Sequence, residues 1–178
     1  FRDALPDFWG RLVYASNNSI PSEIVTNIML MRRSDPFRIG ALDFSDENQI
    51  PNFKAASEVH DMIRLVAAAQ EILDGNEVGL DCEERRLFLQ GTSMGGARPK
   101  ATVLHEGRLF LAKFPVKDDR FDNARVEMAL SDLARHVGIE TPNTQLIPLP
   151  DGRGVFLSER FDREPVPGKS GSFFRKGF

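Results

Sequence analysis

Apolar and polar residues alternate in two short runs near the middle of the chain, at residues 101–105 and 108–114. An alternation of this kind is typical of β-strands that bury one face. Glu106 and Gly107 separate the two runs. A two-residue connection with glycine in second place favours a tight hairpin turn, in which Gly107 takes a positive φ. The pattern therefore predicts an antiparallel hairpin at the centre of the chain.

Apolar residues recur three and four positions apart on both sides of this hairpin, which is the spacing of amphipathic helices. We predict helices over residues 22–33, 57–73, 83–89 and 123–137. Gly75 and Gly138 follow two of these segments, where glycine commonly ends a helix. Further strands are predicted over residues 37–44, 144–149 and 154–161. The expected fold class is α+β, with a mainly helical region before a small antiparallel sheet and one helix.

The helix expected over residues 123–137 has Asn123 as its candidate N-cap. Its apolar residues form one stripe, composed of Val126, Leu130, Leu133 and Val137. The two strands that follow it lead to a segment rich in proline and glycine, residues 165–171, for which we expect a mobile loop.

A loop of glycine, hydroxyl and basic residues lies directly before the hairpin, with the sequence Gly-Thr-Ser-Met-Gly-Gly-Ala-Arg-Pro-Lys at residues 91–100. Small residues allow backbone N–H groups to approach phosphate oxygens, and Lys113 adds a fixed positive charge from an otherwise apolar strand. This combination suits a phosphate site, although glycines beside serine and threonine are also ordinary in turns. A Walker A motif is excluded because Ala97 follows the glycine pair, and the Gly-x-Gly-x-x-Gly spacing does not occur in the chain.

This loop and four other segments together resemble the HipA family, the serine/threonine kinase toxins of bacterial toxin–antitoxin pairs. The other segments are Asp3-Ala-Leu-Pro-Asp-Phe-Trp-Gly-Arg11, Leu111-Ala-Lys-Phe-Pro115, Glu127 within a helix, and Leu157-Ser-Glu-Arg-Phe-Asp-Arg163. The resemblance implies three parts. Residues 1–90 would be the mainly helical amino-terminal region, residues 91–163 a nucleotide-binding lobe like the upper lobe of a kinase, and residues 164–178 a loop and the start of a carboxy-terminal lobe.

The resemblance also implies roles for single residues. Lys113 would hold the phosphates of ATP, and Glu127 would fix this lysine through an ion pair. The backbone of Glu159 and Phe161 would bind the adenine edge. The loop residues expected at the nucleotide are Ser93, Met94, Gly95, Gly96 and Ala97. Autophosphorylation of Ser93 would eject the loop, and the phosphoserine could then bind an exposed base such as Arg98 or Lys100.

Each of these residues has an ordinary structural interpretation as well. Lys113 could be a surface lysine that extends along apolar side chains. Glu127 was expected in the first turn of its helix, where a carboxylate favours the helix dipole. Ser93 could cap a turn, and Glu159 and Phe161 could simply end a strand, with the phenylalanine buried. The sequence alone leaves these alternatives open.

The catalytic machinery of a kinase is not found in this sequence, because neither His-x-Asp-x-x-x-x-Asn nor Asp-Phe-Gly occurs. We therefore assign no catalytic residue and no metal ligand here, and expect an amino-terminal portion that is inactive alone. The resemblance implies ATP and Mg²⁺ as cofactors, with the metal ligands outside this chain. It also implies a helix-turn-helix antitoxin of the HipB type as partner, a protein substrate such as an aminoacyl-tRNA synthetase, and DNA contact only through the antitoxin. A non-catalytic nucleotide-binding module and an antitoxin-docking module are the alternatives.

Composition adds constraints on compartment and ligand. Hydrophobic residues make up 41% and charged residues 28% of the chain, as in soluble globular proteins. The net charge is −3, yet residues 91–126 contain seven basic against four acidic residues, which suits an anionic ligand. Cys82 is the single cysteine, so no intrachain disulfide can form. No apolar run is long enough to span a membrane. We expect a cytoplasmic protein without membrane contact.

Overall fold

The computed structural model describes residues 5–32, 37–38, 62–76, 88, 96–169 and 172–175. Its helices are α1 (Phe8–Asn18), the 3₁₀ helix η2 (Ser22–Ile24), α2 (Asn27–Arg32), α3 (Met62–Leu73) and α5 (Asn123–His136). Its strands are β1 (Lys100–His105), β2 (Arg108–Lys113), β3 (Thr144–Pro148), β4 (Gly154–Glu159), β5 (Arg163–Pro165) and β6 (Phe173–Arg175). The α+β fold class is confirmed. The helix expected over residues 83–89 lies outside the described residues except for Phe88, and so does the strand over 37–44 except for two residues.

The main sheet has the strand order β1-β2-β4-β3, and every neighbouring pair is antiparallel. The central hairpin is confirmed, since His105 pairs with Arg108 across a two-residue turn. Both turn residues have left-handed backbones, with φ of 49° at Glu106 and 74° at Gly107. Such a turn matches the right-handed twist of the strands and fixes their register.

One face of the sheet carries the main hydrophobic core. Apolar side chains of β1, β2 and β4 point to this face and pack against α1 and α3; among them are Ala101, Val103, Phe110, Ala112, Val155 and Leu157. Trp9 in α1 is fully buried there and meets the ring of Phe88 edge-on at 5.6 Å. Its indole Nε1–H also donates to the carbonyl oxygen of Lys100 at 2.8 Å. The amino-terminal helix α1 is therefore attached both to the core and to the first strand of the sheet.

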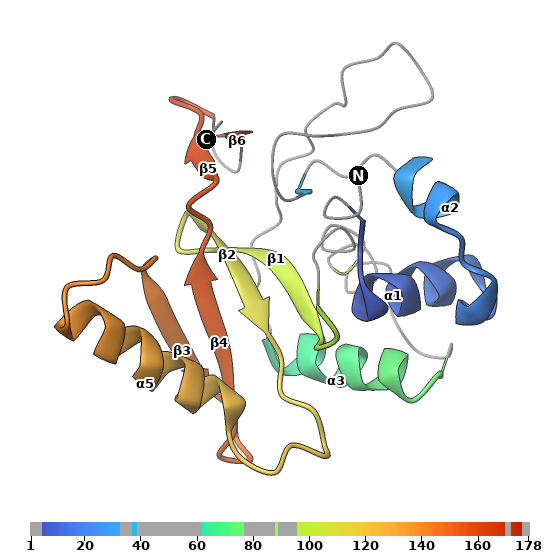
Figure 1. Ribbon diagram of the computed structural model, residues 1–178, viewed down its shortest axis with the longest axis horizontal. Coiled ribbons are helices and arrows are strands. Elements are labelled where there is room, and N and C mark those ends of the chain that lie inside the picture. The colour runs from blue at the N-terminus through green and yellow to red at the C-terminus, as the bar shows by residue number, and fades with distance from the viewer. Residues whose placement is uncertain are drawn as a thin grey trace.

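Helix α5 lies beside β3 and β4 (Figure 1). Its apolar stripe does not face the sheet: Val126, Leu130, Leu133 and Val137 are all exposed. The helix turns a different face inward, on which Ala124 is the buried residue. Its N-cap is Asp122, whose side chain accepts from the amide of Arg125, and not Asn123 as predicted. The helical period predicted the helix correctly but not the face that it buries.

Two further details differ from the sequence-based expectations. The segment expected to be one helix over 22–33 is divided into η2 and α2, because the chain is extended at Val25 between them. The segment expected to be a mobile loop over 165–171 starts within a small hairpin, in which β5 pairs with β6. Gly75 and Gly138 have φ of 74° and 84°, as expected for glycines that follow helices.

Replacement of Trp9 by phenylalanine tests the attachment of α1 to the sheet. The variant loses a buried hydrogen bond to the Lys100 carbonyl and leaves unfilled volume, so we expect a loss of about 1–3 kcal/mol in unfolding free energy. Phe8→Leu is the matched control, because Phe8 is exposed and its replacement should change stability by less than about 0.5 kcal/mol. Urea unfolding curves that coincide for wild type and Trp9→Phe would contradict this account.

Candidate functional site

Lys113 and Glu127 form an ion pair between the sheet and α5, through the lysine Nζ and the carboxylate Oε2. Both side chains are about one-third exposed, at 31% and 33%. Lys113 is the last residue of β2 and pairs in register with Phe156 of β4. Its Nζ also lies 5.6 Å from the centre of the Phe156 ring, within cation–π range. Two independent contacts thus hold the ammonium group on the face of the sheet that α5 covers.

The ordinary interpretation of Glu127 as a first-turn carboxylate is wrong. Helix α5 begins at Asn123, and its first turn contains no acidic residue. Interaction with the helix dipole falls off within the first turn, so it does not account for Glu127. The contact that the structure gives this carboxylate is the one with Lys113.

A second lysine, Lys100, lies directly opposite Lys113 in the β1–β2 register. Residues paired in this way project from the same face of a sheet, so two ammonium groups are neighbours here. Lys100 is almost fully buried, and burial and the positive charge of Lys113 lower its pKa to about 8. The expectation that Lys100 is an exposed base is therefore wrong. Arg98, the other base named for that role, is engaged with Asp119, with Nη1 2.8 Å from Oδ1.

The end of the glycine loop approaches Lys100. Of the five loop residues predicted to contact nucleotide, Gly96 and Ala97 are described, whereas Ser93, Met94 and Gly95 lie outside the described residues. Gly96 has a φ of 99°, and a Cβ at this position would lie 2.7 Å from the Nζ of Lys100. The backbone conformation strongly favours glycine here, whereas the ammonium group ends a flexible side chain that could shift away from a Cβ. The amide of Gly96 donates to the Asp7 carboxylate at 2.6 Å.

The other predicted contacts, Glu159 and Phe161, lie at the end of β4. The Glu159 carboxylate pairs with Arg108, and the distance from Arg108 Nη1 to Glu159 Oε2 is 3.0 Å. The backbone amide of Glu159 donates to the carbonyl of Asn143 at 2.8 Å. Phe161 is 65% exposed, so the interpretation of this residue as a buried strand-end phenylalanine is wrong. The register places Glu159 three residues along β2 from Lys113, which corresponds to about 10 Å at the usual strand rise.

A buried charge cluster fixes the chain just after Glu159. Arg160 makes two hydrogen bonds to the Asp162 carboxylate, at 2.8 and 2.6 Å, and Arg163 donates to the same carboxylate at 2.7 Å. Arg160 and Arg163 also donate to the carbonyls of Phe37 and Arg38. Burial alone would raise the pKa of Asp162, but the hydrogen bond from Arg160 and the charges of Arg160 and Arg163 lower it. This cluster ties the segment at residues 37–38 to the end of β4.

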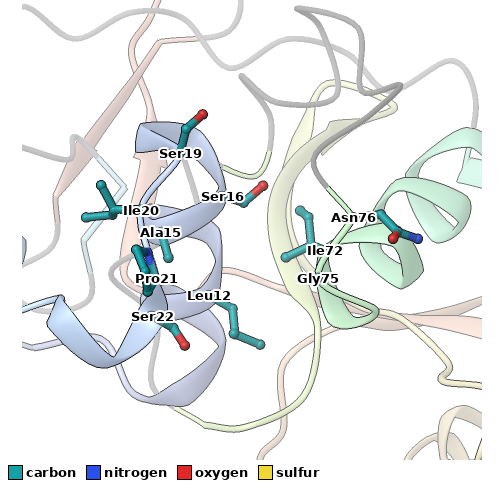
Figure 2. Close-up of a pocket in the computed structure, with 10 residues that line it drawn as sticks. All are labelled: Leu12, Ala15, Ser16, Ser19, Ile20, Pro21, Ser22, Ile72, Gly75 and Asn76. Carbon is teal, nitrogen blue, oxygen red and sulfur yellow. The ribbon is translucent and has the colours of Figure 1, made fainter.

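The cavities described for the molecule lie away from the lysines. One, of about 420 Å³, is bounded by α1, the turn that follows it and the end of α3 (Figure 2). Leu12, Ala15, Ile20 and Ile72 form its apolar part, and Ser16, Ser19 and Ser22 add hydroxyl groups. Another, of about 340 Å³, lies between α3 and the loops after β2 and β3. Neither is lined by Lys113 or Glu127.

Within the described part of the chain, no three or more His, Cys, Asp or Glu side chains are grouped so as to hold a metal ion. Over the same part of the chain, no helix has the length and apolar content needed to cross a membrane.

Residues 92–176 match the family model of the HipA-like C-terminal domain. The matched segment is just under half of the 178-residue chain and supports membership of the HipA family. The matched model describes a C-terminal domain, so it does not support the interpretation of this chain as the amino-terminal portion of such a protein. Comparisons with curated proteins and with solved structures gave no match. The proposed division at residues 1–90, 91–163 and 164–178 stays a prediction.

Sequence reasoning found Lys113 and Glu127 but did not include Lys100 or Asp7 among the site residues. Lys100 could have been identified from the hairpin itself, because a turn at Glu106 and Gly107 places residue 100 opposite residue 113. Asp7 had no such local signal, since it is 89 residues from Gly96.

The lowered pKa of Lys100 predicts a pH dependence of stability. Its pKa falls from 10.5 to about 8 on folding, so the unfolded chain binds more protons between these values. The stability of wild type relative to Lys100→Met should therefore rise as the pH increases from about 8 to about 10.5, and Lys100→Met should have its largest advantage below pH 8. Urea unfolding of both proteins across this range measures the difference. A difference that does not change with pH would contradict the assignment.

Proposed function

We propose that this chain provides the nucleotide-binding lobe of an ATP-dependent protein serine/threonine kinase of the HipA toxin type. The observation that carries the proposal is the ion pair between Lys113 on β2 and Glu127 on α5. Protein kinases use a strand lysine held by a helix glutamate to orient the ATP phosphates. The match of residues 92–176 to the HipA-like C-terminal domain supports the same assignment.

The residues present fit a triphosphate. Lys113 is held by Glu127 and the Phe156 ring, so its ammonium group needs little reorganisation to contact a phosphate oxygen. Lys100 adds a second positive charge beside it, and Gly96 allows the backbone to come close. Adenine would bind at the backbone of Glu159 and Phe161, which the buried arginine–aspartate cluster holds in place. ATP would supply the transferred phosphoryl group, and this chain would bind and orient it.

Catalysis needs groups that are not assigned to any residue of this chain. A base that positions the protein hydroxyl and the ligands of Mg²⁺ are required for phosphoryl transfer. A nucleotide-binding module without catalysis is therefore the second candidate function, favoured by the lack of a His-x-Asp-x-x-x-x-Asn motif in this sequence. A HipB-type antitoxin and an aminoacyl-tRNA synthetase substrate are proposals that rest on the family resemblance. A cytoplasmic location is a proposal that rests on the composition of the chain.

Replacement of Lys113 by alanine tests the phosphate role. We expect ATP to bind about 10- to 100-fold more weakly, because one charge-assisted contact to phosphate is lost. In a kinase that contains all the catalytic groups, the rate should fall by about two to three decades. Lys117→Ala is the matched control, since Lys117 pairs with Asp74 at 2.9 Å and should leave ATP binding unchanged. Calorimetric titration with ATP measures both. Equal affinities for Lys113→Ala and wild type would show that Lys113 is an ordinary surface residue.

Ser93 provides a second test, on the regulation of the same loop. A phosphate on Ser93 adds close to two negative charges beside the positions proposed for the ATP phosphates, and like-charge repulsion should oppose ATP binding. Ser93→Asp should therefore weaken ATP binding, whereas Ser93→Ala should bind as wild type does and, in the complete kinase, should not inactivate itself. Calorimetry on the three proteins decides: if Ser93→Asp binds as tightly as wild type, Ser93 acts only as a turn cap.

A further inference from the structure

We propose that Asp7 is a positioning residue for the nucleotide site, which holds the end of the glycine loop beside Lys100 from outside the HipA-like segment. The ligand in this proposal, ATP, rests on the proposed function. The contact itself does not, because it is a feature of the protein without nucleotide.

The side chain of Asp7 does not cap the helix at whose N-terminus it lies. Asp7 occupies the N-cap of α1, where a carboxylate normally accepts from amides of its own helix, yet it makes no such bond. Its Oδ2 instead accepts from the amide of Gly96 at 2.6 Å, across 89 residues of sequence. Hydrogen bonds to an ionised acceptor are among the stronger ones in proteins. The carboxylate therefore ties the loop to α1 at the cost of a helix cap.

A second bond from the same helical turn fixes the other end of the segment. Trp9 donates to the carbonyl of Lys100 at 2.8 Å, in the core. We call these two bonds, from Asp7 to Gly96 and from Trp9 to Lys100, the loop clasp. Both Asp7 and Trp9 precede residue 92, where the match to the HipA-like domain begins. The geometry of the loop end is thus set by a helix that lies outside that domain.

The charge of Asp7 has a second effect on the site. Lys100 Nζ lies close to Gly96, so the Asp7 carboxylate and this ammonium group are near one another. Four other charges act on Lys100 in addition to its burial: Asp7 and Glu127 favour its protonated form, and Lys113 and Arg98 oppose it. Asp7 therefore helps to retain a second positive charge beside Lys113, where the phosphates would bind.

The first experiment needs no nucleotide. Asp7→Ala, Asp7→Asn and the control Glu23→Ala, which removes an exposed acid of η2, are compared with wild type in the 178-residue chain. The amide resonance and hydrogen-exchange protection of Gly96 are followed by NMR. We expect loss of protection in Asp7→Ala, partial retention in Asp7→Asn, whose side-chain oxygen can still accept, and no change in the control. If the Gly96 amide is equally protected in all four proteins, its hydrogen bond to Asp7 is refuted. Thermal unfolding of each variant verifies that it is folded.

The second experiment is a calorimetric titration of the same proteins with ATP. We expect Asp7→Ala to bind about 5- to 20-fold more weakly, and Asp7→Asn to remain within about threefold of wild type. If both variants bind ATP more tightly, Asp7 is a competing anion and its positioning role is wrong. Unchanged ATP affinity in Asp7→Ala would also refute that role, whatever Gly96 shows. If wild type binds no ATP, the proposed function and the nucleotide part of this proposal fail together, whereas the Gly96 measurement still decides on the clasp.

Discussion

The register of the β1–β2 hairpin is the constraint on which the rest of the structure depends. Glu106 and Gly107 close the turn with two left-handed residues, and this fixes which side chains lie on each face. One face receives apolar residues that pack against α1 and α3. The other face receives Lys100 and Lys113 side by side. A shift of one strand by one residue against the other would turn one of these two ammonium groups towards the hydrophobic core, where an unpaired charge is strongly unfavourable.

Helix α5 is joined to this face of the sheet by an ion pair. The helix has a conspicuous apolar stripe, yet it turns that stripe outward and places Ala124 and Glu127 towards the sheet. The apolar stripe of a surface helix normally faces the core. On the face towards the sheet, Glu127 forms its ion pair with Lys113. A partly exposed pair of this kind stabilises too little to outweigh burial of four apolar side chains, so it does not by itself set the orientation of the helix. The amino-terminal helix α1 contributes from the opposite direction, since Asp7 and Trp9 fasten the segment that leads into β1.

Much of the sheet could be predicted from sequence, because its signals are local. The alternation and the Glu-Gly turn are both contained within residues 101–114, and both were confirmed. The pairing of Lys113 with Glu127 was expected only from the resemblance to kinases of the HipA family. The bonds of Asp7 to Gly96 and of Arg160 to Phe37 span 89 and 123 residues. No period or motif encodes such contacts, since they depend on how separate elements meet in the folded chain. For the same reason the period of α5 predicted a helix but not the face that it buries.

The most direct test of the central claim, that Lys113 and Glu127 act as one unit at a nucleotide site, is a double-mutant cycle on ATP affinity. Calorimetric titrations compare wild type, Lys113→Ala, Glu127→Ala and the double variant. The account predicts that Glu127→Ala weakens binding nearly as much as Lys113→Ala does, and that the double variant binds no more weakly than Lys113→Ala, because the glutamate acts through the lysine. If the two single effects add, or if Glu127→Ala binds ATP as wild type does, the ion pair has no part in nucleotide binding and the central claim is wrong.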